Sequence, residues 1–164
     1  MARENKYPRK NKIRKIVICT SASFYKDALK IEKELKKLGL KVAAPLTAKV
    51  MEKAGNFDIS FYKTWFKNPK DYNRKAFLMR NHFNKVVKAD AMLVVNLEKN
   101  GVEGYIGGNT LMEMAIGFYL RKPIFILNKI SGGCLFYEEI LGMKPIFLHS
   151  DLTKIRVPAK RKKS

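Results

Sequence analysis

Short runs of apolar residues alternate along the chain with longer segments in which apolar residues recur every three or four positions. The short runs predict five buried strands, at residues 15–20, 41–46, 90–97, 123–128 and 145–149. The longer segments predict helices at residues 25–40, at 74–89, after the glycine pair at 107–108, and at 134–142. Residues 47–73 are rich in aromatic residues and are predicted to be irregular.

Strands that alternate with helices predict a parallel sheet with right-handed crossovers. We therefore expect one Rossmann-like or flavodoxin-like α/β domain, with about five parallel strands and helices on both faces, over residues 15–150. Residues 1–14 and 151–164 are expected to be basic tails.

The charge of the chain is concentrated at its ends. The formal net charge is +20, of which +6 lies in residues 1–15 and +5 in residues 156–164. Such tails either attach a protein to RNA or DNA or keep it soluble, and charge alone does not decide between these roles. No apolar run approaches the roughly 20 residues of a membrane span, so we expect a cytoplasmic protein without membrane contact. The two cysteines have neither metal-ligand nor disulfide spacing, and no metal is expected.

In a parallel α/β sheet the ligand binds outside the carboxyl ends of the strands. Thr20, Ser21 and Ser23 follow the first strand and precede a helix, an arrangement that suits a phosphate or a sugar. Ser23 also has the position of an ordinary helix cap. The chain has no G-x-G-x-x-G after the first strand and no Walker-type motif, which argues against NAD, FAD and P-loop ATP chemistry. No cofactor is expected.

Glu113 is the one charged residue in the otherwise apolar interior of the helix that follows Gly107 and Gly108. With Asn109 as the helix cap, Glu113 lies in the second turn on the same face as Asn109. Burying an unpaired carboxylate costs several kcal/mol, so Glu113 needs either a partner or a catalytic purpose. The two glycines would let a ligand approach the backbone closely. A surface glutamate on a helix edge is the alternative.

Three stretches carry a resemblance to a known family: "IVICTSASFY", "KADAMLVVN" and "GGNTLMEMAIGFYLRKPIFIL". Over residues 14–150 the chain resembles the nucleoside 2-deoxyribosyltransferase superfamily, which includes nucleoside 2'-deoxyribosyltransferases and deoxynucleoside 5'-monophosphate N-glycosidases. More closely, it looks like a branch with a "YIGGNTLMEM" motif. The resemblance implies transfer or hydrolysis at an N-glycosidic bond, and a homodimer or higher oligomer.

The resemblance also implies roles for individual residues. Glu113 would be the nucleophile that forms a ribosyl-enzyme intermediate, and Asp90 would orient the sugar or handle a proton. Phe24 or Tyr25 would pack against the sugar or base. Gly107 stands where the transferases have an aspartate and the monophosphate glycosidases have a small residue that contacts phosphate. The substrate is therefore expected to be a nucleotide rather than a free nucleoside, with hydrolysis favoured over base exchange.

Other residues and alternatives stay open. His82 either lines the site or is a structural helix residue, and Asn96 and Asn128, which end strands, either bind ligand or do not. Residues 57–77 interleave aromatic with basic residues and predict a lid over a base, a single-stranded RNA platform, or a core or dimer contact. Two other functions remain: a phosphoribohydrolase of the cytokinin-activating type, although its P-G-G-x-G-T-x-x-E pattern is incomplete here, and a non-catalytic nucleic-acid-binding protein.

Overall fold

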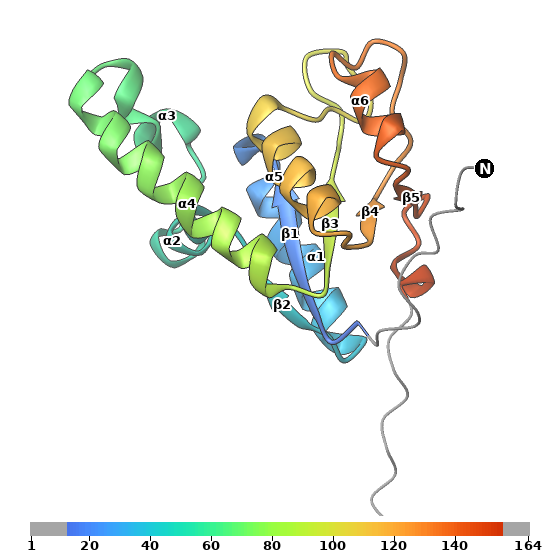
Figure 1. Ribbon diagram of the computed structural model, residues 1–164. Coiled ribbons are helices and arrows are strands. Elements are labelled where there is room, and N and C mark those ends of the chain that lie inside the picture. Colours follow the sequence, from blue (N-terminus) through green and yellow to red (C-terminus); the bar gives the residue numbers. More distant parts are fainter. Residues whose placement is uncertain (1–12, 156–164) are drawn as a thin grey trace, which may run out of the picture.

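Five parallel strands form the centre of the protein, which is described by a computed structural model over residues 13–155. The strands are β1 (Lys15–Thr20), β2 (Lys41–Ala43), β3 (Ala91–Val95), β4 (Ile124–Ile126) and β5 (Ile146–Phe147). Their order in the sheet is β2-β1-β3-β4-β5, and every neighbouring pair is parallel. The prediction of a single flavodoxin-like α/β domain with five parallel strands is confirmed (Figure 1).

Helices cover both faces of this sheet (Figure 1). The α-helices are α1 (Tyr25–Lys37), α2 (Leu46–Ala54), α3 (Ile59–Tyr62), α4 (Tyr72–Lys88), α5 (Gly108–Tyr119) and α6 (Tyr137–Gly142). Within the described part of the chain there are also four short 3-10 helices: η1 (Ala22–Phe24), η2 (Thr64–Phe66), η3 (Pro69–Asp71) and η4 (Leu152–Lys154). Core residues of α1 and η4 pack on one face, and core residues of α4, α5 and α6 pack on the other.

The alternation of side chains along β1 places a cysteine on the face that carries α4 and α5. Ile16 and Ile18 belong to the core cluster under α1, whereas Val17 and Cys19 belong to the cluster under α4 and α5. All four side chains are fully buried, which explains why the strand is a continuous apolar run. Cys19 thus faces the helix that carries Glu113.

Gly117 lets α5 lie close to the sheet. A Cβ atom at this position would come within 2.5 Å of the Sδ atom of Met92 in β3. The close approach fixes the distance of α5 from β3 and, with it, the position of Glu113 one turn earlier in the helix.

The prediction that residues 47–73 are irregular is wrong, because they include most of α2, all of α3 and two 3-10 helices. The helical period of α2 is carried by only two buried residues, Ala48 and Met51, and the helix ends at Gly55 with a left-handed φ of 64°. The predicted second strand is also shorter than expected, since the chain turns into α2 at Pro45.

Buried core residues lie past residue 150, the predicted end of the domain. Leu152 and Ile155 are buried in the core beside α1, and Ile13 joins them from the amino-terminal side. Apart from residues 13–14 and 151–155, the two predicted basic tails lie outside the described residues, and their contact with RNA or DNA stays a prediction. Between residues 13 and 155, none of the helices has both the length and the hydropathy needed to cross a membrane.

Candidate active site

A pocket of about 220 Å³ lies where the carboxyl end of β1 meets the amino end of α5. It is lined by the end of β1, the loop that follows β3, and the first turns of α5. Residues of α2, α3, η2 and α4 also line it. The lining includes Thr20, Ser21, Tyr25, Lys63, Lys75, His82, Lys99, Gly107, Gly108, Asn109 and Glu113. The pocket lies where parallel α/β sheets commonly bind ligands.

Glu113 lines this pocket, although its side chain is almost fully buried, with an exposed fraction of 3%. Asn109 Nδ2 donates a hydrogen bond of 2.8 Å to Glu113 Oε1. The Oδ1 atom of the same amide accepts a hydrogen bond of 3.2 Å from Lys75 Nζ. Asn109 is therefore not the helix cap that the sequence suggested, since Gly107 holds that position, but a link between a lysine of α4 and the carboxylate of α5.

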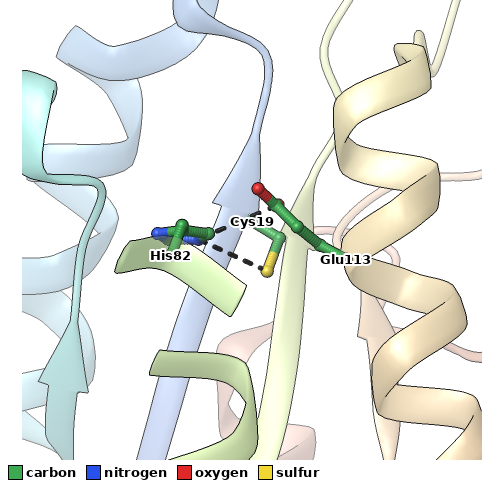
Figure 2. Close-up of side chains that lie close together, drawn as sticks. All are labelled: Cys19, His82 and Glu113. Carbon is green, nitrogen blue, oxygen red and sulfur yellow. Dashed lines mark hydrogen bonds and ion pairs between the residues drawn. The ribbon is translucent and has the colours of Figure 1, made fainter. Parts of the chain in front are cut away.

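Cys19, His82 and Glu113 converge from β1, α4 and α5 (Figure 2), and the last two line the pocket. Cys19 Sγ lies 3.7 Å from His82 Nε2, and His82 Nε2 lies 3.8 Å from Glu113 Oε2. The second distance is too long for a normal hydrogen bond. The arrangement thus holds the carboxylate between a thiol and an imidazole without a strong direct bond to the imidazole.

Burial makes this cluster neutral in the free protein near pH 7. Burial raises the pKa of Glu113 to about 8, against the lowering effects of the Cys19 thiol, the Lys75 ammonium and the Asn109 amide. Burial, and to a smaller extent the nearby Lys85, lowers the pKa of His82 to about 4. Burial, together with Glu113, raises the pKa of Cys19 well above its ordinary value. The contact between His82 and Glu113 is therefore one between neutral groups and not an ion pair.

The same three side chains meet the distance requirement for a metal site. Their donor atoms all lie within 4.8 Å of one another, and thiolate, imidazole and carboxylate are ligands of zinc. The electrostatics disfavour a cation, however, because three lysines line the same pocket and burial favours the protonated thiol and carboxyl groups that a metal would have to deprotonate. We assign no metal to this cluster.

The structure brings eight of the residues proposed from sequence to the pocket. They are Thr20, Ser21, Tyr25, His82, Gly107, Gly108, Asn109 and Glu113. The Thr20 hydroxyl is already engaged, since Oγ1 donates a hydrogen bond of 2.5 Å to the backbone carbonyl of Val95. A Cβ atom built on Gly108 would meet nothing within 4 Å, so the backbone at the start of α5 is open to a ligand.

Four other proposed residues lie away from the pocket lining. Ser23 is exposed and makes no side-chain cap, and Phe24 is buried in a T-shaped contact with Tyr105, at a centroid distance of 6.4 Å. Asn96 and Asn128 hold the ends of β3 and β4 together: Asn128 N donates to Asn96 Oδ1 at 2.9 Å, and Asn96 Nδ2 donates to the Asn128 carbonyl at 3.0 Å. Both amides are thus used by the fold.

The role expected for Asp90 requires a correction, because this residue lies at the amino ends of the strands, on the side of the sheet away from the pocket. It directly precedes β3, and its Oδ2 accepts hydrogen bonds from the backbone N–H groups of Arg14 and Lys15, at 2.9 and 2.8 Å. The pocket lies at the carboxyl ends of the strands, so the expected catalytic role for Asp90 does not fit its position. Asp90 instead anchors the chain at the start of β1.

Sequence reasoning missed several residues of the site, above all Cys19 and the lysines Lys63, Lys75 and Lys99. Lys75 could have been predicted from the sequence, since it is seven residues before His82 on α4 and so lies on the same helix face. Cys19 could not have been predicted as a site residue, because a cysteine in an apolar strand is most simply a core residue.

Comparison with known proteins shows a similarity of fold to solved structures. The chain matches no protein-family model and no curated protein sequence. It is similar to the structure of the 2-deoxyribosyltransferase of the psychrotolerant bacterium Bacillus psychrosaccharolyticus, over 68% of this chain and 70% of that chain. The two share 17% sequence identity, with a TM-score of 0.44. At these values the similarity concerns the general path of the chain and indicates nothing about the site residues.

Proposed function

We propose that the protein cleaves the N-glycosidic bond of a nucleoside 5'-phosphate, with Glu113 as the nucleophile. The observation that carries this proposal is the position of a nearly buried carboxylate in a pocket, beside a glycine-rich helix start and three lysines. A carboxylate serves a glycosidase as a nucleophile, and basic groups with free backbone N–H groups bind phosphate. The "YIGGNTLMEM" resemblance implies the same role for Glu113.

The proposed reaction has two steps. A carboxylate oxygen of Glu113 attacks the anomeric carbon C1', the C1'–N bond breaks, and the base leaves with the bonding electrons and takes up a proton. Water then attacks C1' of the resulting glycosyl ester, delivers the hydroxyl group to the sugar and frees the carboxylate. If a second base attacks in place of water, the same intermediate leads to base transfer. The developing positive charge on the sugar is stabilised by the carboxylate.

The surroundings of Glu113 suit a carboxylate that must be ionised to react. Asn109 and the Cys19 thiol stabilise the charged form, and Lys75 adds a positive charge that is linked to Glu113 through Asn109. These effects oppose the burial that keeps the group protonated in the free protein. Burial in turn removes much of the water that would weaken the nucleophile.

The experiment that tests this function is a screen of the purified protein for base release from nucleosides and nucleoside 5'-phosphates, ribo and deoxy, followed by chromatography. The Glu113→Gln variant supplies the comparison, and Glu103→Gln, which changes an exposed glutamate outside the pocket lining, is the matched control. We expect base release by the parent protein and by Glu103→Gln, and a loss of at least about 10³-fold in Glu113→Gln. Absence of base release from every nucleotide would contradict the proposal.

A further inference from the structure

Three lysines from separate elements line the pocket that contains Glu113. Lys63 follows α3, Lys75 lies in the first turn of α4, and Lys99 lies in the loop between β3 and α5. All three side chains are half-buried. They therefore form a cationic lining that the fold assembles from segments far apart in the sequence.

The three lysines of this lining face a single carboxyl group. Among the described residues that line the pocket, Glu113 is the only carboxyl group, and at neutral pH burial keeps it protonated. The pKa of Lys63 is lowered first by burial and then by repulsion from Lys99 and Lys75. The pKa of Lys75 is likewise lowered by burial. Placing three ammonium groups together in a partly desolvated pocket is unfavourable without an anion.

The three lysines differ in how far the protein already uses them. Lys75 Nζ donates to Asn109 Oδ1 and lies 5.6 Å from the ring centroid of Trp65, and Lys99 Nζ lies 4.9 Å from the ring centroid of Tyr105. The backbone N–H of Lys63 donates to the carbonyl of Ile59, but its ammonium group makes no hydrogen bond and no ion pair with any residue between 13 and 155. Its ammonium group is therefore available to a ligand.

The charge of the lining exceeds that of a single phosphate. A phosphate monoester carries about −1.5 to −2 at pH 7, and the backbone N–H groups at the start of α5 already offer one anion site. Three lysines in addition match an anion of about −3, which a chain of two or more phosphates provides. Lys75 is tied to Asn109 in the first turn of α5, so it can serve the phosphate nearest the sugar, with Lys63 and Lys99 serving the next.

We propose that Lys63, Lys75 and Lys99 form a subsite for a phosphate chain, and that the ligand of this pocket is a nucleoside diphosphate or triphosphate. The proposal rests on the proposed function for the identity of the sugar and base. The lysines determine specificity for the number of phosphates, and the reaction at C1' stays with Glu113.

Binding measured without turnover tests this subsite. Isothermal titration calorimetry compares inorganic phosphate with inorganic pyrophosphate on the full chain, in the parent protein, Lys63→Gln and Lys99→Gln. Lys67→Gln and Lys70→Gln are matched controls, because these exposed lysines lie in the same segment but outside the pocket lining. We expect pyrophosphate to bind the parent protein at least about tenfold more tightly than phosphate, and each pocket substitution to remove most of that difference. Equal affinity for the two anions, or an unchanged preference in Lys63→Gln and Lys99→Gln, would overturn the proposal.

A second set of titrations separates the nucleotide from a free phosphate chain. On Glu113→Gln, which is expected not to consume them, nucleoside diphosphates are compared with the matching monophosphates and with pyrophosphate. If a nucleoside diphosphate binds more tightly than both its monophosphate and pyrophosphate, the result supports a nucleotide ligand. If pyrophosphate binds as tightly as every nucleoside diphosphate, that part of the proposal is overturned. A protein that releases base from monophosphates without any preference for pyrophosphate would contradict only the subsite. A protein that binds pyrophosphate through the lysines without releasing base would contradict only the proposed function.

Discussion

Asn109 Nδ2 donates a hydrogen bond of 2.8 Å to Glu113 Oε1, one turn further along α5. The two residues share a helix face, so this contact needs no distortion of the backbone. Lys75 orients the amide from the other side, because its Nζ donates to Asn109 Oδ1. The amide therefore fixes one carboxylate oxygen and leaves Oε2 near His82, with no hydrogen-bond partner among the described residues.

If Asn109 positions the nucleophile, Asn109→Ala should lower kcat by about 10²-fold, since a carboxylate free to rotate spends less time aligned for attack. Stability should change little, because the side chain is only half-buried. Steady-state kinetics of base release measure the effect, with Asn73→Ala as control, since Asn73 is exposed on α4 and outside the pocket lining. Unchanged kcat in Asn109→Ala would show that the amide has no such role.

The pH dependence of the reaction should report the pKa of Glu113. Burial raises this pKa to about 8, and only the ionised carboxylate attacks. The value of kcat/KM should therefore rise about tenfold per pH unit up to about pH 8 and level off above it. No inflection is expected near pH 6.5, since the pKa of His82 is lowered to about 4. A profile that is already flat from pH 5 upward would contradict this assignment.

The ionisation of Glu113 should also make the free energy of unfolding depend on pH. The carboxyl group of Glu113 binds its proton up to about pH 8 when folded but only to about pH 4.5 when unfolded, so the free energy of unfolding falls as pH rises through this window. The decrease attributable to Glu113 should be on the order of a few kcal/mol and should be absent in Glu113→Gln. Urea unfolding at pH 5 and at pH 9, for both proteins, measures the difference.

Gly108→Ala should weaken ligand binding without lowering the stability of the fold. Nothing lies within 4 Å of the position a Cβ would take, and the backbone there is not left-handed, so alanine is accommodated in the free protein. Stability should stay equal or rise by about 0.5–1 kcal/mol. The added methyl group should block the approach of phosphate to the start of α5 and raise KM at least about tenfold.

Gly142→Ala is the matched control for this change, because Gly142 ends α6, has open space around it and lies outside the pocket lining. Its melting temperature and KM should stay close to those of the parent protein. An unaltered KM in Gly108→Ala would mean that the ligand does not approach α5 at this point.

The aromatic segment, residues 57–77, should form the contact of a homodimer. Phe61, Phe66 and Phe77 expose 66%, 73% and 57% of their surface, which is unusual for large apolar side chains that lie near one another in sequence. Light scattering at micromolar concentration should show a dimer, and Phe66→Ser should shift it toward the monomer. Phe118→Ser, on α5, is the comparison. Loss of the dimer in Phe118→Ser alone would place the interface elsewhere, and a monomeric parent protein would contradict the prediction.

The sheet could be predicted because β1 and β3 are buried on both faces and therefore read as uninterrupted apolar runs. Glu113 could be predicted for the complementary reason, since a single charge in an apolar helix stands out. Helix α2 could not, because only Ala48 and Met51 of its residues face the core.

The roles of polar residues at strand ends were harder to predict than their positions. Asn96 and Asn128 lie just past the ends of the neighbouring strands β3 and β4, and their amides pair with each other's backbone and with neighbouring loops. Asp90 directly precedes β3, and there it lies at the amino ends of the strands, opposite the pocket. Whether a polar side chain binds a ligand or bonds to the protein itself depends on residues that are distant in sequence. The lysine lining could not be predicted for the same reason, because it is assembled from three separate segments.

The central claim is that Glu113 forms a covalent bond to the sugar. In a nucleotide with fluorine at C2', the electron-withdrawing fluorine destabilises the cationic transition state for hydrolysis of the glycosyl ester. The ester should therefore accumulate. After acid quenching and proteolysis, mass spectrometry should find the sugar phosphate on the peptide that contains Glu113, in the parent protein and in Glu103→Gln but not in Glu113→Gln. A parent protein that releases base without forming this adduct, while Glu113→Gln turns over at the parent rate, would contradict the account.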